Sequence, residues 1–279
     1  MNIGIRLHDT AGQTLEEHLR AAHEQGFTCI HLAMQKVIPG FAMLEAPSLL
    51  TNDLAAQVRE LLEKYQLQCA VLGCYLNLAT PDEEALAKNV ACYRAHLRFA
   101  RLIGAVVVGT ETGAPNTGYK TCPECWTEES LKLFIRRLAP VARYAEEEGA
   151  ILAIEPVCRH IVNTPERAQC VLEQVNSDAL QIILDGVNLL TPQNCHQADI
   201  IMADAIARLS DRIRMLHLKD YQLAEGKSDV QALACGLGRM EYGRLLRFAQ
   251  QHPGMPITLE NTKPDNAEAA RLFLEGYAV

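Results

Sequence analysis

The sequence lacks any long hydrophobic run and any cluster of basic residues, and each absence excludes a class of partner. No apolar stretch reaches the roughly 18 residues that a membrane-spanning helix needs, so we expect no membrane interaction. The formal net charge of -8 would repel a polyanion, and no group of lysines or arginines interrupts it, which disfavours nucleic acid as a partner. A small-molecule substrate is the better expectation.

A secretory signal and a cysteine framework are also missing. Residues 1–10 contain no basic segment followed by an apolar stretch, which predicts a cytoplasmic location. In that reducing compartment the ten scattered cysteines are expected to be mostly buried thiols rather than disulfides. Cys122 and Cys125 form a CxxC motif before an expected helix, and we interpret them as ordinary loop cysteines, with a structural zinc site or a redox function as the alternatives.

The glycine-rich dinucleotide fingerprint GxGxxG does not follow the first apolar run. CGLGRM at residues 235–240 comes too late in the chain and has a different spacing, which disfavours an open, doubly wound sheet. No linker, low-complexity tract or shift in composition marks a second domain. A chain of 279 residues has the usual length of one α/β barrel, so we expect a single domain.

Short apolar, β-branched runs alternate with longer amphipathic stretches along the whole chain. This pattern is typical of repeated βα units around a parallel sheet. The eight runs are residues 2–7, 28–33, 67–73, 105–111, 150–156, 180–185, 213–220 and 255–260. The alternation predicts an α/β fold in which a single (β/α)8 TIM barrel spans residues 1–279.

The stretches between the runs carry start and stop signals of helices. Thr14 and Thr80 are expected N-caps, and Pro165 falls in the first turn of its helix. Glycines stand where three of the helices should stop, at residues 26, 104 and 149. The helices are therefore expected to fit between the strands with short connections.

Three of the apolar runs close with a carboxylate, and a fourth carries a histidine near its end. These residues are Glu155, Asp185, Glu260 and His217. Because the carboxyl ends of all barrel strands meet at one face, the four side chains are expected at one mouth. Any single acid could cap the following helix and His217 could lie in the interior, but four such residues in consecutive strands favour a site.

Three carboxylates packed together repel one another unless they are paired, protonated or bound to a metal. A divalent cation resolves this conflict most directly. Carboxylates with a single imidazole suit Mn²⁺ as the first choice, with Mg²⁺, Co²⁺ or Zn²⁺ as alternatives. Lys219 follows His217 by two positions and should point the same way, which strengthens the expectation of a site.

Further polar residues near strand ends are candidate substrate contacts, each of which could equally be a loop hydrogen-bonder. They are His8, His31, Asn77, Glu111 and His160, with Glu111 and His160 the strongest. The stretch at residues 117–130 is long for a βα connection and is expected to close over the substrate. Stacking and charge there would come from three of its residues, Tyr119, Lys120 and Trp126.

At these residues the chain resembles the xylose isomerase-like sugar isomerases and epimerases, a barrel superfamily that includes ketohexose 3-epimerases, inosose dehydratases and endonuclease IV. The motifs are AIEPV from residue 153, TPERA from 164, ILDGVNL from 183, MLHLKD from 215, GLGRMEYGRLL from 236 and LENT from 259. The resemblance spans essentially the whole chain. It implies one divalent metal held by the three acids and His217, with Glu155 and Glu260 as the acid/base pair.

The chain departs from the ketohexose 3-epimerase pattern at two points. In that pattern a histidine usually lies three positions after the aspartate that corresponds to Asp185, and this chain has Asn188 there. An arginine that normally follows the histidine corresponding to His217 is also absent. HLKD looks more like the inosose dehydratases and sugar-phosphate isomerases, which places Lys219 at a substrate oxygen. Asn188 remains a candidate substrate contact. Relatives of this kind often pair, so a homo-oligomer is an open expectation.

The expected reaction is isomerisation or epimerisation of a small sugar or sugar phosphate, by proton transfer through a metal-stabilised enediolate. Loss of a β-hydroxyl from the same enediolate would make the protein a dehydratase of an inosose or keto sugar. An endonuclease IV-like phosphodiesterase and a noncatalytic ligand-binding barrel are further alternatives. The net negative charge of the chain opposes a phosphodiesterase that binds nucleic acid. The presence of both Glu155 and Glu260 opposes a noncatalytic barrel.

Overall fold

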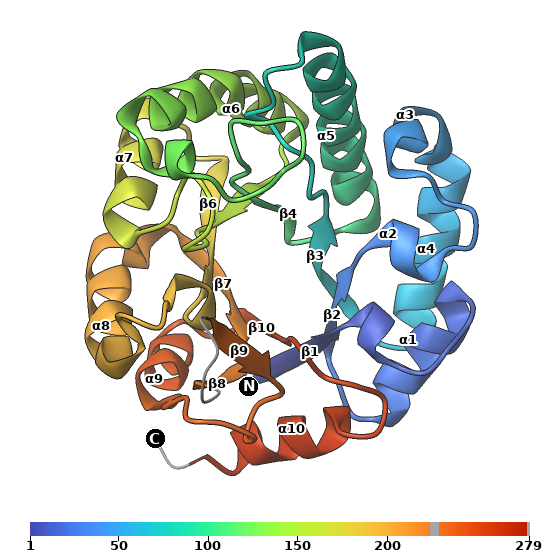
Figure 1. Ribbon diagram of the computed structural model, residues 1–279. Helices are drawn as coiled ribbons and strands as arrows, with labels where there is room; N and C mark the ends of the chain where they lie inside the picture. The colour runs from blue at the N-terminus through green and yellow to red at the C-terminus, as the bar shows by residue number, and fades with distance from the viewer. Residues whose placement is uncertain (224–228, 278–279) are drawn as a thin grey trace.

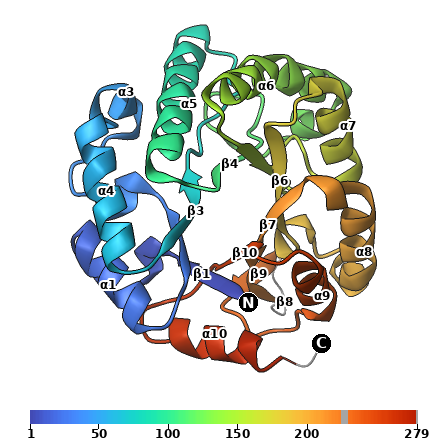
Figure 2. The same ribbon diagram turned by 180° about the vertical axis from the view of Figure 1, so that it is seen from behind.

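The fold is a closed barrel of eight parallel strands surrounded by helices (Figures 1 and 2). The computed structural model describes residues 1–223 and 229–277. Around the barrel the strands follow the order β1-β10-β7-β6-β5-β4-β3-β2. They are β1 (Asn2–Arg6), β2 (Cys29–Leu32), β3 (Gln68–Gly73), β4 (Val107–Glu111), β5 (Leu152–Glu155), β6 (Leu180–Asp185), β7 (Ile213–Leu218) and β10 (Pro256–Leu259). Each lies within one of the eight predicted runs, and the predicted (β/α)8 barrel is confirmed.

The longer helices of the outer ring are α1 (Leu15–Glu24), α4 (Asn52–Lys64), α5 (Glu83–Ile103), α6 (Glu128–Glu148), α7 (Pro165–Val175), α8 (Ala198–Leu209), α9 (Gly243–Gln251) and α10 (Ala267–Glu275). Two short helices, α2 (Met34–Val37) and α3 (Ala46–Leu49), lie between β2 and α4. None of the helices in the described part of the chain combines the length and the apolarity needed to cross a membrane.

The helix boundaries confirm most of the expected signals and correct one. Thr14 caps α1 through a capping box with Glu17, and Pro165 opens α7. The glycines at 104 and 149 end their helices in the left-handed conformation, and Gly26 adopts it just after α1. The prediction for Thr80 is wrong because Asp82 accepts the amide of Ala85 and caps α5, while the hydroxyl oxygen of Thr80 accepts the amide of Asp82 instead of a helix amide. Pro81 separates the two residues and makes a turn before the helix.

A plug of small and aliphatic side chains fills the inside of the barrel. It consists of Cys29, Ala70, Val71, Val107, Ala153, Ile183 and Met215, all of them fully buried. Side chains of a strand alternate between its two faces, so the residue two positions after a plug residue also points inward, toward the C-terminal mouth. The barrel is therefore closed below the mouth, and polar side chains can gather only above the plug.

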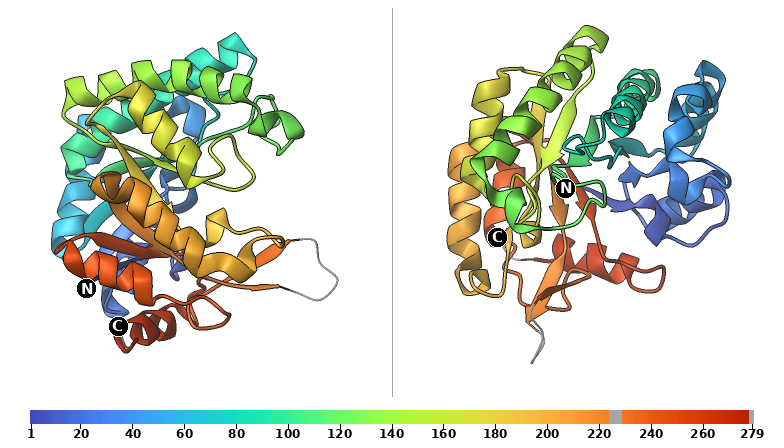
Figure 3. Two further views of the ribbon diagram at one scale, coloured as in Figure 1. Left: turned by 90° about the vertical axis from the view of Figure 1, so that its left-hand side faces the viewer. Right: turned by 45° about the horizontal axis from the view of Figure 1, so that its top comes forward.

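An antiparallel hairpin follows β7 that the sequence pattern did not predict. It consists of β8 (Asp220–Leu223) and β9 (Val230–Leu233), and it projects on the same side of the barrel as the loop before α6 (Figure 3). Buried Asp220 fixes its base by accepting the amides of Tyr221, Gly236 and Met240 at 2.8, 3.0 and 2.8 Å. The predicted run at residues 213–220 thus contains the whole of β7 and the first residue of the hairpin.

All ten cysteines are free, and the majority of them are buried. Cys122 and Cys125 lie on either side of the start of a 3-10 helix, η3 (Pro123–Trp126), with their Sγ atoms 3.7 Å apart. Burial raises the pKa of the Cys125 thiol. The absence of disulfides agrees with the expected thiols.

A buried histidine outside the mouth makes the stability of the fold pH-dependent. His96 of α5 is fully buried, donates from Nδ1 to the carbonyl oxygen of Cys92 at 2.8 Å, and has no described partner for Nε2. Burial lowers the pKa of His96 to about 4, whereas an unfolded histidine titrates near 6.5. Between these two pH values His96 is protonated in the unfolded chain but neutral in the fold. The free energy of unfolding is therefore unaffected by His96 above pH 6.5 and decreases as the pH falls toward 4.

We therefore expect His96 to account for about 2–3 kcal/mol of the loss of unfolding free energy between about pH 7.5 and about pH 4.5. The measurement is urea denaturation of the wild type and of His96→Gln at both pH values. The other titrating groups are common to both proteins, so the difference between the two losses isolates His96. Equal losses in the two proteins would show that His96 binds its proton as easily in the fold as in the unfolded chain.

Candidate metal centre and active site

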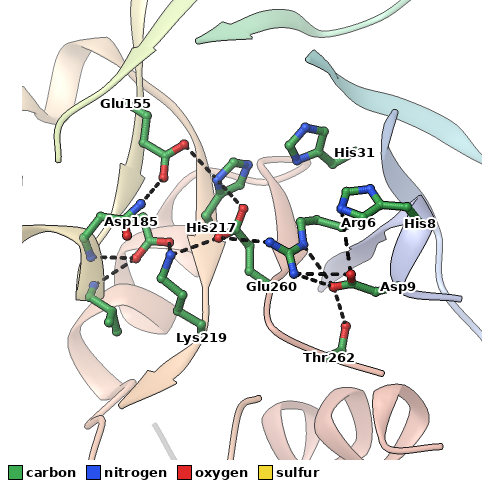
Figure 4. Close-up of polar contacts among 12 residues, drawn as sticks. Arg6, His8, Asp9, His31, Glu155, Asp185, His217, Lys219, Glu260 and Thr262 are labelled. Atoms are coloured by element: carbon green, nitrogen blue, oxygen red, sulfur yellow. Dashed lines mark hydrogen bonds and ion pairs between the residues drawn. The ribbon is translucent and has the colours of Figure 1, made fainter. Parts of the chain in front are cut away.

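The polar side chains of the mouth come from strand ends one layer above the plug (Figure 4). Glu155 follows Ala153 by two positions in β5, Asp185 follows Ile183 in β6, and His217 follows Met215 in β7. Glu260 lies immediately after β10. The side-chain period of two therefore carries each of these groups to the interior, and all four residues are buried.

His217 is the centre of this group. Its Nδ1 lies 3.3 Å from Oε2 of Glu155 and 3.4 Å from Oε1 of Glu260. The ligand atoms of Glu155, Asp185 and His217 lie within 4.8 Å of one another, and so do those of His31, His217 and Glu260. The structure thus brings the four predicted metal-ligating residues together, as two overlapping triads that share His217.

Lys219 supplies a cation inside the same cluster. Its Nζ lies 2.8 Å from Oδ2 of Asp185 and donates to Oε2 of Glu260 at 2.9 Å (Figure 4). The side chain of Lys219 is 6% exposed, so the ion pair is shielded from water. The predicted inward orientation of Lys219 is correct, and its ammonium compensates part of the charge of the carboxylates.

Each of two carboxylates has one oxygen held by the chain and the other directed into the cluster. Oδ1 of Asp185 accepts the amides of Val187 and Asn188 at 2.9 and 3.1 Å, at the start of the 3-10 helix η4 (Val187–Leu189). Nδ2 of Asn188 donates to Oε1 of Glu155 at 2.6 Å. Asn188 is therefore a positioning residue for Glu155, and it leaves Oε2 of Glu155 facing His217.

Burial and neighbouring charges change the protonation of the cluster. Burial raises the pKa of Asp185 to about 6. Burial alone would lower the pKa of His217, but Glu155 and Glu260 raise it to about 9. For Glu260, burial alone would raise the pKa, but Lys219, His217 and Arg6 lower it well below its usual range. The cluster is held by strong attraction between buried opposite charges.

The donor atoms fit a divalent cation. Both ring nitrogens of His217 are buried, and neither makes a hydrogen bond within the described residues. A buried imidazole whose Nδ1 faces two carboxylates, and whose Nε2 has no partner among the described residues, belongs to a donor set that suits Mn²⁺ and similar divalent ions. A metal would require the neutral imidazole. Glu155, Asp185, His217 and Glu260 could hold such an ion, with His31 as a ligand that we had expected to contact substrate.

Two predicted substrate contacts, His8 after β1 and His31 in β2, lie at the triad of His31, His217 and Glu260. The His31 ring stacks on that of His217, with centroids 5.4 Å apart, and its Nε2 lies 3.3 Å from the Tyr75 hydroxyl. Burial lowers the pKa of His31 well below its usual value. Nε2 of His8, after β1, lies 3.8 Å from Oδ1 of Asp9. The two histidines therefore line the mouth on the side of Glu260.

Glu111 and His160 meet on the other side of the mouth, next to Glu155. Oε2 of Glu111 lies 3.5 Å from both Nδ1 of His160 and the Tyr119 hydroxyl. Burial, with help from the charges of Glu155 and Glu260, raises the pKa of Glu111 to about 7. Burial lowers the pKa of His160 to about 4. The long loop before α6 thus reaches the site through Tyr119, whereas its Lys120 is exposed.

Asn77 is engaged with that same loop. Its Nδ2 donates to the carbonyl oxygens of Ala114 and Asn116 at 2.8 and 2.9 Å, and its Oδ1 accepts the amide of Ala79 at 2.9 Å. These bonds give Asn77 a structural function at the base of the loop. A contact with substrate stays a prediction.

The sequence reasoning missed Arg6 at the end of β1. Its guanidinium donates to Asp9 from Nε at 2.9 Å and from Nη2 at 3.2 Å, and Asp9 also accepts the hydroxyl of Thr262 at 3.1 Å. Nη1 lies 4.0 Å from Oε2 of Glu260. Arg6 is the last residue of β1, as Glu155 and Asp185 are the last residues of β5 and β6, but only the contact with Glu260 assigns it to the cluster.

A model of the xylose isomerase-like TIM barrel family matches residues 19–277. A search of curated proteins gives no match. Among solved structures, 3-keto-D-glucoside 4-epimerase from E. coli is 16% identical, with a TM-score of 0.76 over 99% of this chain and 100% of that chain. The probable 3-DHS dehydratase of petrobactin synthesis from Bacillus anthracis is 12% identical, with a TM-score of 0.77 over the whole of both chains.

The IOLI protein, solved with a bound zinc atom, is 18% identical, with a TM-score of 0.73 over 99% of this chain and 95% of that chain. At these identities the solved structures show a shared fold. The family match covers nearly the whole chain, from α1 to the residues that follow α10. The chain belongs to the xylose isomerase-like TIM barrel family.

Proposed function

We propose that this protein is a divalent-metal-dependent isomerase or epimerase of a small sugar or sugar phosphate. The observation that carries the proposal is the pair of buried glutamates, Glu155 and Glu260, that approach the same nitrogen of His217 at 3.3 and 3.4 Å. They come from different strands, so a substrate carbon lying over His217 would have one carboxylate on either side. Proton removal next to a carbonyl group needs such carboxylates within hydrogen-bond reach of the carbon.

Glu155, Asp185, His217 and Glu260 would hold the cation, with Mn²⁺ as our first choice. When bound there, a divalent ion would offset the charge of the carboxylates and stabilise the negative charge that develops on the substrate oxygens. Support comes from the ring nitrogens of His217, which make no hydrogen bond within the described residues, and from the zinc atom bound to the IOLI protein. The metal-ligating assignment is a proposal on these grounds.

The proton transfer itself would be carried by the two glutamates. One carboxylate removes the proton from the carbon next to the carbonyl group. If the other returns a proton to the opposite face of that carbon, the product is the epimer, whereas return to the neighbouring carbon gives the isomer. Lys219 would donate a hydrogen bond to the substrate oxygen that gains negative charge, and Asn188 would keep Oε2 of Glu155 as its free oxygen. The structural similarity to an epimerase, the 3-keto-D-glucoside 4-epimerase from E. coli, supports this branch.

Glu111 favours dehydration as the second candidate reaction. Its Cα is paired with that of Glu155 across β4 and β5, and its pKa of about 7, raised mainly by burial, leaves much of the carboxyl protonated near neutrality. A protonated carboxyl there could donate its proton to a hydroxyl that leaves as water, after a glutamate has removed the proton from the adjacent carbon. The structural similarity to the probable 3-DHS dehydratase from B. anthracis supports this alternative.

The test is proton-deuterium exchange in D₂O with a panel of ketoses, sugar phosphates and inososes, after metal analysis of the purified protein. We expect exchange into at least one compound, loss of exchange in EDTA, and recovery when Mn²⁺, Mg²⁺, Co²⁺ or Zn²⁺ is returned. Product analysis then separates an epimer, an aldose and a dehydrated sugar. A protein that binds metal but exchanges no proton across the panel would contradict the proposed chemistry.

A further inference from the structure

A cavity lies beside the proposed metal centre, and the proposed proton transfer does not use it. Its volume is about 300 Å³, at the lower end of the range for small-molecule sites. Loops that follow different strands line it, with η3, the turn after β5, the segment after β6 and the start of β9 each contributing. The polar and aromatic residues among them include Trp126, Arg159, Asn188, Thr191, Gln193 and Asp229.

Asn188 connects this cavity to the reaction centre. It belongs to the wall of the cavity, and its Nδ2 donates to Oε1 of Glu155 at 2.6 Å. The backbone also links the turn after β5 to the segment after β6, because the amide of Cys158 donates to the carbonyl oxygen of Asn188 at 2.7 Å. A ligand that reaches from the centre into the cavity would therefore pass directly beside Glu155.

The lining has the chemistry of a neutral, hydroxylated ligand. Trp126 is the only tryptophan of the chain, and 48% of it is exposed, so its indole has a free face for stacking. The Thr191 hydroxyl, the Gln193 amide and the Asn188 amide oxygen make no hydrogen bond within residues 1–223 and 229–277, which leaves donors and acceptors for hydroxyl groups.

The charges of the lining oppose an anionic ligand. Arg159 is a cation and Asp229 is an anion, so the two side chains together give the cavity no surplus positive charge. The adjacent centre carries three carboxylates, with Lys219 already paired to two of them. Among the residues that the structure describes, one cation and one anion line the cavity, so a phosphate group would gain no net positive charge from the lining, whereas a sugar ring requires none.

We propose that this cavity is a subsite for a second, uncharged sugar ring, so that the substrate is a glycosylated keto sugar rather than a free monosaccharide. The reacting ring would lie over His217, and the second ring would stack on Trp126 and bond to Asn188 and Thr191. The position of the reacting ring rests on the proposed function. The subsite itself rests on the cavity and its lining.

Fluorescence provides the test, because all tryptophan emission comes from the cavity wall. Three glucosyl-fructoses with different linkages (maltulose, isomaltulose and turanose) are titrated against the metal-loaded protein, with D-fructose as the comparison. We expect at least one disaccharide to change the emission saturably, at a concentration about tenfold lower than D-fructose requires. Equal or weaker binding of all three disaccharides would overturn the subsite.

Deuterium exchange with Trp126→Ala supplies a second readout. The substitution is expected to raise the ratio of the KM for the disaccharide to the KM for D-fructose by about tenfold. Leu44→Ala, which removes another exposed apolar side chain far outside the lining, should leave that ratio unchanged. An unchanged ratio in Trp126→Ala would overturn the subsite.

The two proposals fail in different ways. Glu155→Gln should lose exchange and still show the fluorescence response, because the stacking ring does not need the base. Exchange on every ketose with no preference for a second ring would overturn the subsite and keep the proposed reaction. Saturable fluorescence with no exchange in the wild type would keep the subsite and overturn the proposed reaction.

Discussion

Replacing Glu155 with glutamine is expected to lower the rate of solvent proton exchange by about 10²–10⁴-fold. Glutamine keeps the shape of the side chain and can still accept the hydrogen bond of Asn188, but it cannot accept a proton from carbon. The rate is measured by NMR in D₂O with saturating Mn²⁺, and the bound metal is quantified in the same sample. Measuring both separates loss of the base from loss of a metal ligand.

Glu166 provides the matched control for that experiment, since it is an exposed glutamate in the first turn of α7, the helix that follows β5. Glu166→Gln should leave the exchange rate unchanged. Glu260→Gln completes the comparison, because a two-base epimerase that lacks one glutamate should still exchange the proton of one epimer while failing to interconvert the two. Full activity in metal-loaded Glu155→Gln would remove Glu155 from the proton transfer.

Replacing Lys219 with methionine is expected to lower the unfolding free energy of the metal-free protein by about 3–5 kcal/mol. The ammonium is buried at 2.8 and 2.9 Å from Asp185 and Glu260, so its loss leaves two buried carboxylates without their nearest cation. Urea denaturation in EDTA measures the loss. Addition of Mn²⁺ should recover part of it, because an ion bound by the same carboxylates restores the missing charge and stabilises the fold by mass action.

Lys88 is the control for this second substitution. Its ammonium lies 2.6 Å from Glu84, but both side chains are exposed, so Lys88→Met should leave the unfolding free energy nearly unchanged. A similarly small change in Lys219→Met would show that Lys219 does not compensate the cluster. If the unfolding free energy of Lys219→Met is the same with and without Mn²⁺, the metal ion does not bind to the carboxylates that contact Lys219.

The strands and the central acids could be predicted from sequence because both follow from local rules. A run of aliphatic residues marks a buried strand, and an inward side chain recurs every second residue, so Ala153 in the plug implies that Glu155 lies above it. The same reasoning places Asp185 and His217. The xylose isomerase-like resemblance added the expectation of a metal, which spacing alone could not give.

The features that could not be predicted depend on contacts between distant segments. Asp220 anchors the β8–β9 hairpin through amides at positions 236 and 240, which no local pattern reveals. Arg6 acquires its significance only from Glu260, on the last strand of the barrel. The pairing of Lys219 with two acids likewise depends on three strands closing side by side. Such long-range polar pairing has no signature in a single stretch of sequence.

The pairing of β1 with β10 joins the two ends of the chain, with Asn2 opposite Pro256 and Ile5 opposite Leu259. During synthesis a nascent chain already contains Glu155, Asp185 and His217 when more than forty residues before Glu260 have still to be made, as the numbering shows. The second glutamate reaches His217 only when β10 enters between β7 and β1. Ring closure and assembly of the glutamate pair are therefore one event, and a barrel opened at this seam would keep only one member of the proposed acid/base pair.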